Sequence, residues 1–185
     1  MEDISSRSRI VIREFPGRGR GLVAAEAIPR GRLIERSPVL IIPEGEREAI
    51  DRGLLFTYVF IWEKGWQEQD LYRHRGRAGL ALGYTTLLNH SYDPNVDYVH
   101  HVDEAFLDIV AIRDIRPGEE LTIDYEMDLW FDPGEPEPAD LAARRAERAR
   151  CRAAARDSLA HETVHESVHE TVHDMAIPGH SAGSA

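Results

Sequence analysis

The sequence of 185 residues has little cysteine, no long apolar run and fewer basic than acidic residues. The single cysteine, Cys151, excludes an internal disulfide framework and any zinc site built from several cysteines. No apolar segment approaches the roughly 18–20 residues that a helix needs to cross a bilayer. The first residues also lack the apolar run of a signal peptide. We therefore expect a soluble intracellular protein, cytoplasmic by default, that does not act at a membrane.

The shortage of positive charge is confined to the first 140 residues. Residues 141–185 contain six arginines and six carboxylates, so the net charge of −11 lies entirely within residues 1–140. A nucleic-acid ligand needs clustered lysines and arginines at its phosphates, and only residues 144–156 offer such a cluster. We expect no direct nucleic-acid partner for the acidic part. Its charge favours a basic protein or peptide as partner, or serves only solubility.

Turn residues and composition divide the chain into three parts. Residues 1–131 carry the apolar segments, and this length suffices for one domain with a buried core. A proline-rich linker covers residues 132–140, and a tail covers residues 141–185. The start of the tail, residues 141–160, is rich in Ala and Arg and favours a helix. Because it has few large apolar groups, we do not expect that helix to pack on the domain.

The rest of the tail contains a four-residue repeat, His-Glu-Thr/Ser-Val, that starts at His161 and ends on His173. On a helix its four histidines would form one stripe with the i, i+4 spacing of some zinc sites. The repeat supplies neither groups to orient the histidines nor an enclosing core, so a low-complexity, solvated tail is preferred. We predict no metal site.

The apolar pattern predicts a mainly β protein with short helices, of the α+β class. Strands are predicted where β-branched residues cluster or alternate, at residues 9–15, 95–100, 105–112 and 121–125, and residues 33–42 predict one or two further strands. The continuous apolar run at residues 54–62 also predicts a buried strand. Residues 43–52 begin with a proline and acids, which predicts a short surface helix. Residues 65–79 predict a loop, and residues 78–88 a short helical turn.

Three short motifs stand out from this background. The run Gly19-Arg20-Gly21-Leu22-Val23-Ala24 follows the first strand, and its glycines allow a backbone to approach a ligand closely. Residues 88–95 read Leu-Asn-His-Ser-Tyr-Asp-Pro-Asn, a polar corner carried by apolar sequence. Residues 119–125 read Glu-Glu-Leu-Thr-Ile-Asp-Tyr, an apolar alternation that ends in a lone phenol. The corner and the phenol look like two walls of one pocket.

In this order the three motifs resemble the signatures of the SET domain of protein lysine methyltransferases, and look closest to the minimal viral and bacterial members. The resemblance covers residues 9–131. It implies a fold of small β-sheets whose C-terminal segment is threaded under a loop. It also implies an enzyme that transfers a methyl group from S-adenosylmethionine to a lysine amine of a protein. The alternative is a non-catalytic protein-binding module on the same scaffold.

The resemblance also assigns roles to individual residues. It implies that the cofactor S-adenosylmethionine, whose sulfonium charge calls for electron-rich neighbours, lies against Gly19, Arg20, Gly21, Asn89 and His90. Tyr125 corresponds to the catalytic tyrosine, whose hydroxyl orients the amine. A phenol that titrates near 10 is a weak base at neutral pH. We therefore expect positioning and electrostatics to outweigh proton abstraction.

The sequence departs from the family pattern at two positions. Arg20 stands where minimal relatives often have an aromatic residue, and Leu129 stands where an aromatic residue is expected after the tyrosine. We therefore expect a lysine channel that is built differently, from the aromatic residues Tyr58, Tyr92, Trp130 and Phe131. The expected substrate is a basic protein of histone or nucleoid type. The homodimer that some minimal relatives form is an open alternative for this chain.

Overall fold

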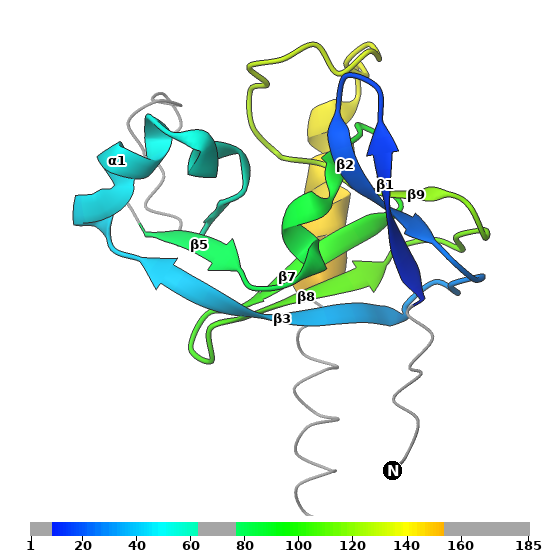
Figure 1. The fold of residues 1–185 in the computed structure, drawn as a ribbon. Coiled ribbons are helices and arrows are strands. Elements are labelled where there is room, and N and C mark those ends of the chain that lie inside the picture. The colour runs from blue at the N-terminus through cyan, green and yellow to red at the C-terminus, as the bar shows by residue number, and fades with distance from the viewer. Residues whose placement is uncertain (1–8, 63–76, 154–185) are drawn as a thin grey trace, which may run out of the picture.

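A computed structural model describes residues 9–62 and 77–153. These residues form two β-sheets, one of four strands and one of five, with short helical segments around them (Figure 1). The mainly β class predicted from the sequence is confirmed. No helix in the described part of the chain is long and apolar enough to cross a membrane.

The four-stranded sheet brings the three motifs together. Its first hairpin consists of β1 (Ile10–Phe15) and β2 (Gly19–Ala24), so the glycine motif is itself a strand. β9 (Glu120–Ile123) pairs antiparallel with β2 on one side and parallel with β6 (Asn89–His90) on the other. The order is therefore β1-β2-β9-β6, with β9 between the glycine motif and the Asn-His pair.

A buried asparagine, Asn95, fastens β9 to the polar corner. Its Nδ2 donates to the Glu120 carbonyl at 2.7 Å, and its Oδ1 accepts from the Thr122 N–H at 2.9 Å. Its own N–H donates to the Thr122 carbonyl at 3.3 Å. Asn95 is only 1% exposed, and a buried polar group without a partner costs about 1–3 kcal/mol, so these bonds fix the corner against the strand. The threading predicted for the C-terminal segment stays a prediction.

The five-stranded sheet is built around β3 (Leu33–Ile42), the longest strand of the described residues. On one side β3 pairs with β8 (Phe106–Ala111), which forms with β7 (Val96–His101) the hairpin predicted from the sequence. On the other side β3 pairs with β5 (Ala78–Ala81), and β5 pairs with β4 (Phe60–Ile61). The order is β4-β5-β3-β8-β7.

Short helical segments connect these strands. They are η1 (Glu44–Glu46), α1 (Arg47–Asp51), η2 (Leu54–Thr57) and η3 (Tyr84–Leu87). η1 and α1 confirm the short helix predicted at residues 43–52. Residues 141–153 form a further helix, which we call the arginine helix.

The main core lies where the two sheets meet. Apolar side chains from both sheets and from the β-bridge between Ile28 and Ile115 form one cluster: Ile10, Leu22, Ala24, Ile28, Leu88, Val96, Ile109, Ala111, Ile115, Leu121 and Ile123. Leu121 of β9 is fully buried in it. Burial of a side chain of this size contributes roughly 1.5–3 kcal/mol. The position of β9 is thus fixed by the burial of its apolar side chains in the core and by the hydrogen bonds of Asn95 to its backbone.

The buried strand predicted at residues 54–62 is wrong. These residues form η2 and the two-residue β4, and Leu54 is 76% exposed. Apolar content alone does not separate a strand from helical turns in a short run. Here Phe56, Tyr58 and Trp62 line a pocket from outside the strands, and Phe60 lines it from β4.

The helical turn predicted at residues 78–88 is right only for η3, because Ala78–Ala81 form the strand β5. Small residues at this strand have a packing reason. A Cβ on Gly79 would lie 2.7 Å from the Trp62 ring and 2.8 Å from Val39, so the tryptophan covers the strand there. The loop predicted at residues 65–79 lies mostly outside the described residues.

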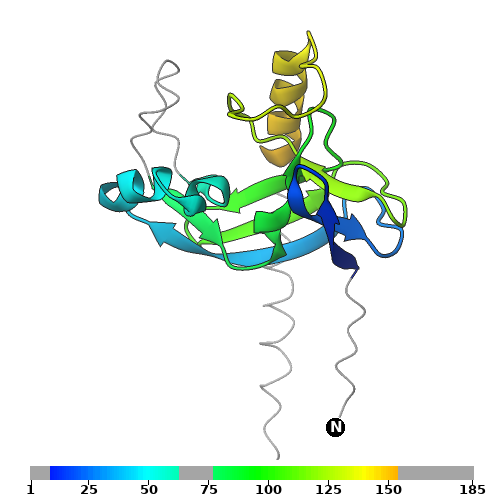
Figure 2. The ribbon, with the colours of Figure 1, turned by 45° about the horizontal axis from the view of Figure 1, so that its top comes forward.

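The expectation that the helix at the start of the tail does not pack is also wrong. Three of its arginines pair with buried or partly buried carboxylates of the domain: Arg145 and Arg148 with Asp124, and Arg152 with Asp97 and Glu126. Figures 1 and 2 show this helix, in yellow to orange, standing against the body of the molecule. The helix has few apolar groups, and ion pairs make this contact instead. The predicted division into domain, linker and tail stays a prediction, and the repeat from His161 lies outside the described residues.

Removal of the arginine helix is predicted to destabilise the domain. A chain that ends at Asp140 leaves the carboxylates of Asp124 and Asp97, which are 1% and 7% exposed, without their arginines. Loss of one partner of a buried ion pair costs about 3–5 kcal/mol, so urea unfolding should show a loss of at least this order. A chain that ends at Ala153 keeps all three arginines and is the control. Equal stability of the two shortened chains would contradict the prediction.

Candidate active site

The glycine strand approaches the Asn-His strand so closely that only glycine fits at one position. A Cβ on Gly21 would lie 2.6 Å from Asn89 Nδ2 and 2.8 Å from the Phe15 ring. Gly19 has a φ of +71°, in the left-handed region that glycine adopts without steric cost. Arg20 stands between them and is exposed. The strand is therefore exposed at Gly19 and Arg20 and packed against Asn89 at Gly21.

Asn89 is oriented by a carboxylate that the sequence analysis missed. Glu120 accepts a hydrogen bond from Asn89 Nδ2 at 2.8 Å through Oε1, and pairs with Arg18 at 2.5 Å through Oε2. The motif carries two adjacent glutamates, and the neighbouring Glu119 instead accepts from Asn95 at 3.1 Å. Only the pairing of β9 with its neighbours shows which carboxylate faces Asn89.

His90 is buried and neutral in this arrangement. Its Nδ1 accepts the Tyr125 backbone N–H at 3.2 Å, which leaves the proton of the neutral ring on Nε2. Nε2 is buried and has no hydrogen-bond partner among the described residues. Burial lowers the pKa of His90 below its usual 6.5, and this outweighs the opposing field of Asp124. The site therefore contains a buried N–H donor that is ready for an acceptor.

Tyr125 lies two residues beyond the end of β9, so the predicted strand ends earlier than expected. Its hydroxyl donates to the Leu88 carbonyl at 3.0 Å. Burial raises the pKa of the phenol to about 12. Because the proton is engaged by the carbonyl, the oxygen presents its lone pairs to whatever lies beside it. The ring stacks on Trp130, with centroids 6.4 Å apart and an interplanar angle of 19°.

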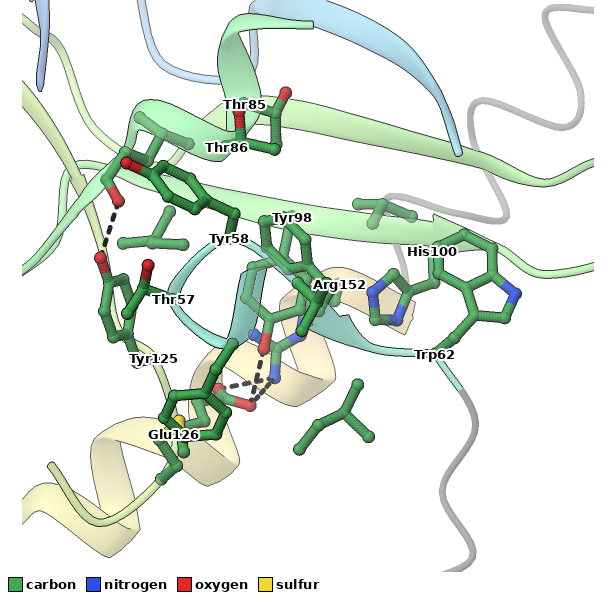
Figure 3. A pocket seen from close by; sticks show the side chains of 18 of the residues that line it. Thr57, Tyr58, Trp62, Thr85, Thr86, Tyr98, His100, Tyr125, Glu126 and Arg152 are labelled. Atoms are coloured by element: carbon green, nitrogen blue, oxygen red, sulfur yellow. Dashed lines mark hydrogen bonds and ion pairs between the residues drawn. The ribbon is translucent and has the colours of Figure 1, made fainter. Parts of the chain in front are cut away.

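A pocket of about 340 Å³ opens beside the Tyr125 ring (Figure 3). The segment of residues 56–62 supplies much of its wall, mostly with aromatic and aliphatic side chains. Of the residues predicted to build a lysine channel, Tyr58 and Trp130 line this pocket together with Tyr125. Tyr92 and Phe131 lie instead against the His90 ring, at centroid distances of 4.6 Å and 6.4 Å.

One end of the pocket carries a polar cluster that the sequence analysis did not find. Arg152 from the arginine helix donates to both oxygens of Glu126 at 2.8 and 3.0 Å (Figure 3). It also donates to Asp97 at 2.8 Å. Its guanidinium lies over the Tyr98 ring, 5.0 Å from the centroid. Burial raises the pKa of the Tyr98 phenol, which donates to Glu126 at 3.3 Å. No local pattern links residues so far apart in the sequence.

The Gly-Asn-His corner fits S-adenosylmethionine by two observations. β2 is exposed at Gly19 and Arg20, and the missing Cβ of Gly21 lets this strand lie directly against Asn89. The buried Nε2–H of His90 lacks an acceptor within the described residues, and an adenine ring offers nitrogen acceptors. The described residues offer no comparable site for a metal ion. No group of three His, Cys, Asp or Glu side chains within residues 9–62 and 77–153 is placed to hold an ion.

Comparison with known sequences gives a coherent set of relatives. A family model described as "SET domain" matches residues 19–126. A Schizosaccharomyces pombe protein named "Histone-lysine N-methyltransferase, H3 lysine-37 specific" is 35% identical over 127 residues, which are 68% of this chain and 79% of that protein. A Fusarium mangiferae "Histone-lysine N-methyltransferase, H3 lysine-9 specific KMT1" is 31% identical over 60% of this chain, and the match spans only 37% of that longer protein.

Solved structures also match this chain. The Neurospora SET domain protein DIM-5, titled a histone lysine methyltransferase, is 25% identical with a TM-score of 0.48, and the match covers 70% of this chain and 57% of that one. The Chaetomium thermophilum polycomb repressive complex 2 contains a chain that is 24% identical with a TM-score of 0.50. That match covers 65% of this chain and 16% of the other. The likeness to the second structure concerns the fold alone.

The buried His90 predicts that the protein loses stability in weak acid. Its folded pKa is below 6.5, so the unfolded chain binds the proton more tightly than the folded one. The contribution of His90 is complete above about pH 6.5 and is lost as the pH falls toward the folded pKa, by up to about 1.4 kcal/mol per pH unit.

Urea unfolding at pH 7.5 and 5.5 measures this loss. His90→Gln keeps an acceptor for the Tyr125 N–H but does not titrate, so the variant should lose less stability between the two pH values than the wild type. Comparison of slopes cancels the other eight histidines. Parallel slopes would contradict a buried, neutral His90.

Proposed function

The chain belongs to the SET domain family and is a protein-lysine N-methyltransferase, and we propose that it uses S-adenosylmethionine to methylate a lysine of a basic, histone-like protein. One observation carries this proposal. Tyr125 presents its hydroxyl oxygen beside an aromatic pocket, and its backbone N–H is bonded to His90 of the Gly-Asn-His corner. A residue that contacts both the pocket and the corner is suited to a methyl transfer between a cofactor in the corner and a lysine amine in the pocket.

We assign the donor to the corner formed by Gly19, Arg20, Gly21, Asn89 and His90. S-adenosylmethionine supplies an electrophilic methyl group on a positively charged sulfur. The backbone of residues 19–21 offers the close approach, and Asn89, oriented by Glu120, offers an amide to the polar part of the ligand. The Nε2–H of His90 is left for an acceptor on the base.

The pocket favours the neutral amine that the reaction needs. A free lysine has a pKa of about 10.4, so only about one in a thousand is neutral near pH 7. Apolar surroundings such as Tyr58, Phe60 and Trp130 disfavour the ammonium and lower this pKa. A free carboxylate in the pocket would act in the opposite direction, but Glu126 is engaged by Arg152.

Tyr125 acts by position rather than as a base. With a pKa of about 12 the phenol stays protonated near neutral pH, so it cannot take up the lysine proton efficiently. Its proton is held by the Leu88 carbonyl at 3.0 Å, and the lone pairs of its oxygen can accept from the amine. The amine is thereby oriented with its own lone pair toward the donor.

Two observations favour a basic substrate: the negative charge of this chain and the names of its relatives. Residues 1–140 carry the full net charge of −11, and the relatives compared above are named for lysines of histone H3. Lysine sites in histone-like tails are flanked by other basic residues. The acidic domain therefore attracts such a segment before specific contacts form.

Tyr125→Phe tests the catalytic assignment. The variant loses the hydroxyl that orients the amine but keeps the ring that stacks on Trp130. We expect methyl transfer to fall by at least about a hundred-fold, the size typical of losing one preorganised polar contact, with donor affinity unchanged within a few-fold by calorimetry. Tyr84→Phe, at a tyrosine that is 48% exposed, is the matched control. Wild-type turnover in Tyr125→Phe would refute the role.

Salt dependence tests the substrate class. For a basic peptide, kcat/KM should fall several-fold as ionic strength rises from about 0.01 M to about 0.15 M, because the Debye length shrinks from roughly 30 to 8 Å. A peptide with the same target lysine and neutral flanks should change much less. If both peptides respond alike, charge does not select the substrate and the acidity serves solubility.

A further inference from the structure

The arginine helix is attached to the domain mainly by charge. Of its described residues only Leu141 is a buried apolar side chain. Five arginines lie within it, and they do not play the same part. Arg150 pairs with Glu147 inside the helix, and both side chains are more than half exposed. Arg144 pairs with the exposed Asp140 and Asp93.

The other three arginines converge on two carboxylates next to Tyr125. Arg145 donates twice to Asp124, from Nε to Oδ2 at 2.9 Å and from its terminal nitrogen to Oδ1 at 2.8 Å, and Arg148 also contacts Oδ2. Asp124 precedes Tyr125 and is 1% exposed at its side chain. Although burial by itself raises the pKa of Asp124, the bonds from Arg145 and the Glu126 N–H lower it below its usual value.

Arg152 holds the residue on the other side of Tyr125. Its guanidinium bridges Glu126 and Asp97, and Asp97 belongs to β7 of the other sheet. Glu126 is therefore tied at once to the helix and to the five-stranded sheet. Tyr98, also on β7, donates to the same carboxylate at 3.3 Å.

The backbone at Glu126 needs this support. Its φ is +53°, in the left-handed region that residues other than glycine seldom occupy, at a cost of order 1 kcal/mol or more. Its N–H donates to Asp124 Oδ1 at 2.8 Å, so the turn is closed by the same carboxylate that the arginines bind. Tyr125 is the residue inside that turn, and the direction of its ring follows from the turn.

We propose that the arginine helix positions Tyr125 by clamping Asp124 and Glu126 on either side of it. This inference deepens the proposed function and rests on it. Arg145, Arg148 and Arg152 are positioning residues. Arg145 and Arg148 lie outside the pocket lining, so they act through Asp124 alone. Buried ion pairs are not needed merely to attach this helix to the domain, because packed apolar side chains stabilise such a contact at least as much. Attachment alone does not explain why three arginines converge on the two carboxylates that flank Tyr125.

The test compares three variants of the full-length chain with the wild type. Arg145→Met/Arg148→Met removes the Asp124 clamp, and Arg152→Met removes the Glu126 clamp. Arg150→Met is the matched control, because that arginine pairs only within the helix. Should the double variant not fold, Asp124→Asn replaces it, since the amide oxygen keeps the bond to the Glu126 N–H while the charge that binds the arginines is lost.

We expect kcat to fall by about ten-fold to a hundred-fold in each clamp variant, as for a misplaced catalytic group. KM for the peptide should stay within about three-fold in the Asp124-clamp variant, which does not touch the pocket, and donor affinity should be unchanged in both. Hydrogen exchange at the Tyr125 amide should accelerate at least about ten-fold, because the turn opens more often. Arg150→Met should match the wild type in every measurement.

The outcomes separate this inference from the proposed function. If folded clamp variants keep wild-type kcat and wild-type exchange at Tyr125, the helix merely attaches and the positioning role is overturned. If the wild type itself transfers no methyl group to any lysine peptide, the proposed function fails. In that case the exchange data still decide whether the arginines hold the turn.

Discussion

The structure depends on one buried amide. Asn95 bonds the backbone of Glu120 and Thr122, which lie 25 and 27 residues further along the chain, and so joins the polar corner to β9. With β9 fastened in this way, β2 can pair on one side of it and β6 on the other. The glycine edge, the Asn-His pair and the Tyr125 turn then meet at a single strand. Loss of these bonds would leave polar groups buried without partners, so the arrangement is strongly specified.

Burial and charge are distributed unevenly around this strand, and the chemistry follows from that. On one side, desolvation keeps His90 neutral and Tyr125 protonated. On the other side, the carboxylates of Asp124, Asp97 and Glu126 are paired with arginines of the arginine helix. The pocket between them therefore has mostly apolar walls, and its carboxylate Glu126 is paired with Arg152. Such a site favours a neutral lysine and an oriented lone pair.

The same ion pairs show that the arginine helix is attached to the domain. Ala and Arg in the sequence favour a helix, and that helix is present. An arginine-rich segment would suit nucleic acid, but each of the arginines from Arg144 to Arg152 is paired with a carboxylate of the same chain. The segment is therefore better described as part of the catalytic domain's support than as a separate basic arm.

The sequence by itself determined the features that depend on short stretches: the mainly β class, the hairpin of β7 and β8, the helix after β3, and three motifs of a SET domain. These features follow from side-chain period, turn residues and residue order, which are local. It misjudged residues 54–62, because a short apolar run suits a strand or a helical turn equally well. Glu120 beside Asn89, Arg152 at the pocket and the arginines on Asp124 were decided only by the tertiary structure. Their partners lie 21 to 55 residues away, and an ion pair at such separation leaves no period in the sequence.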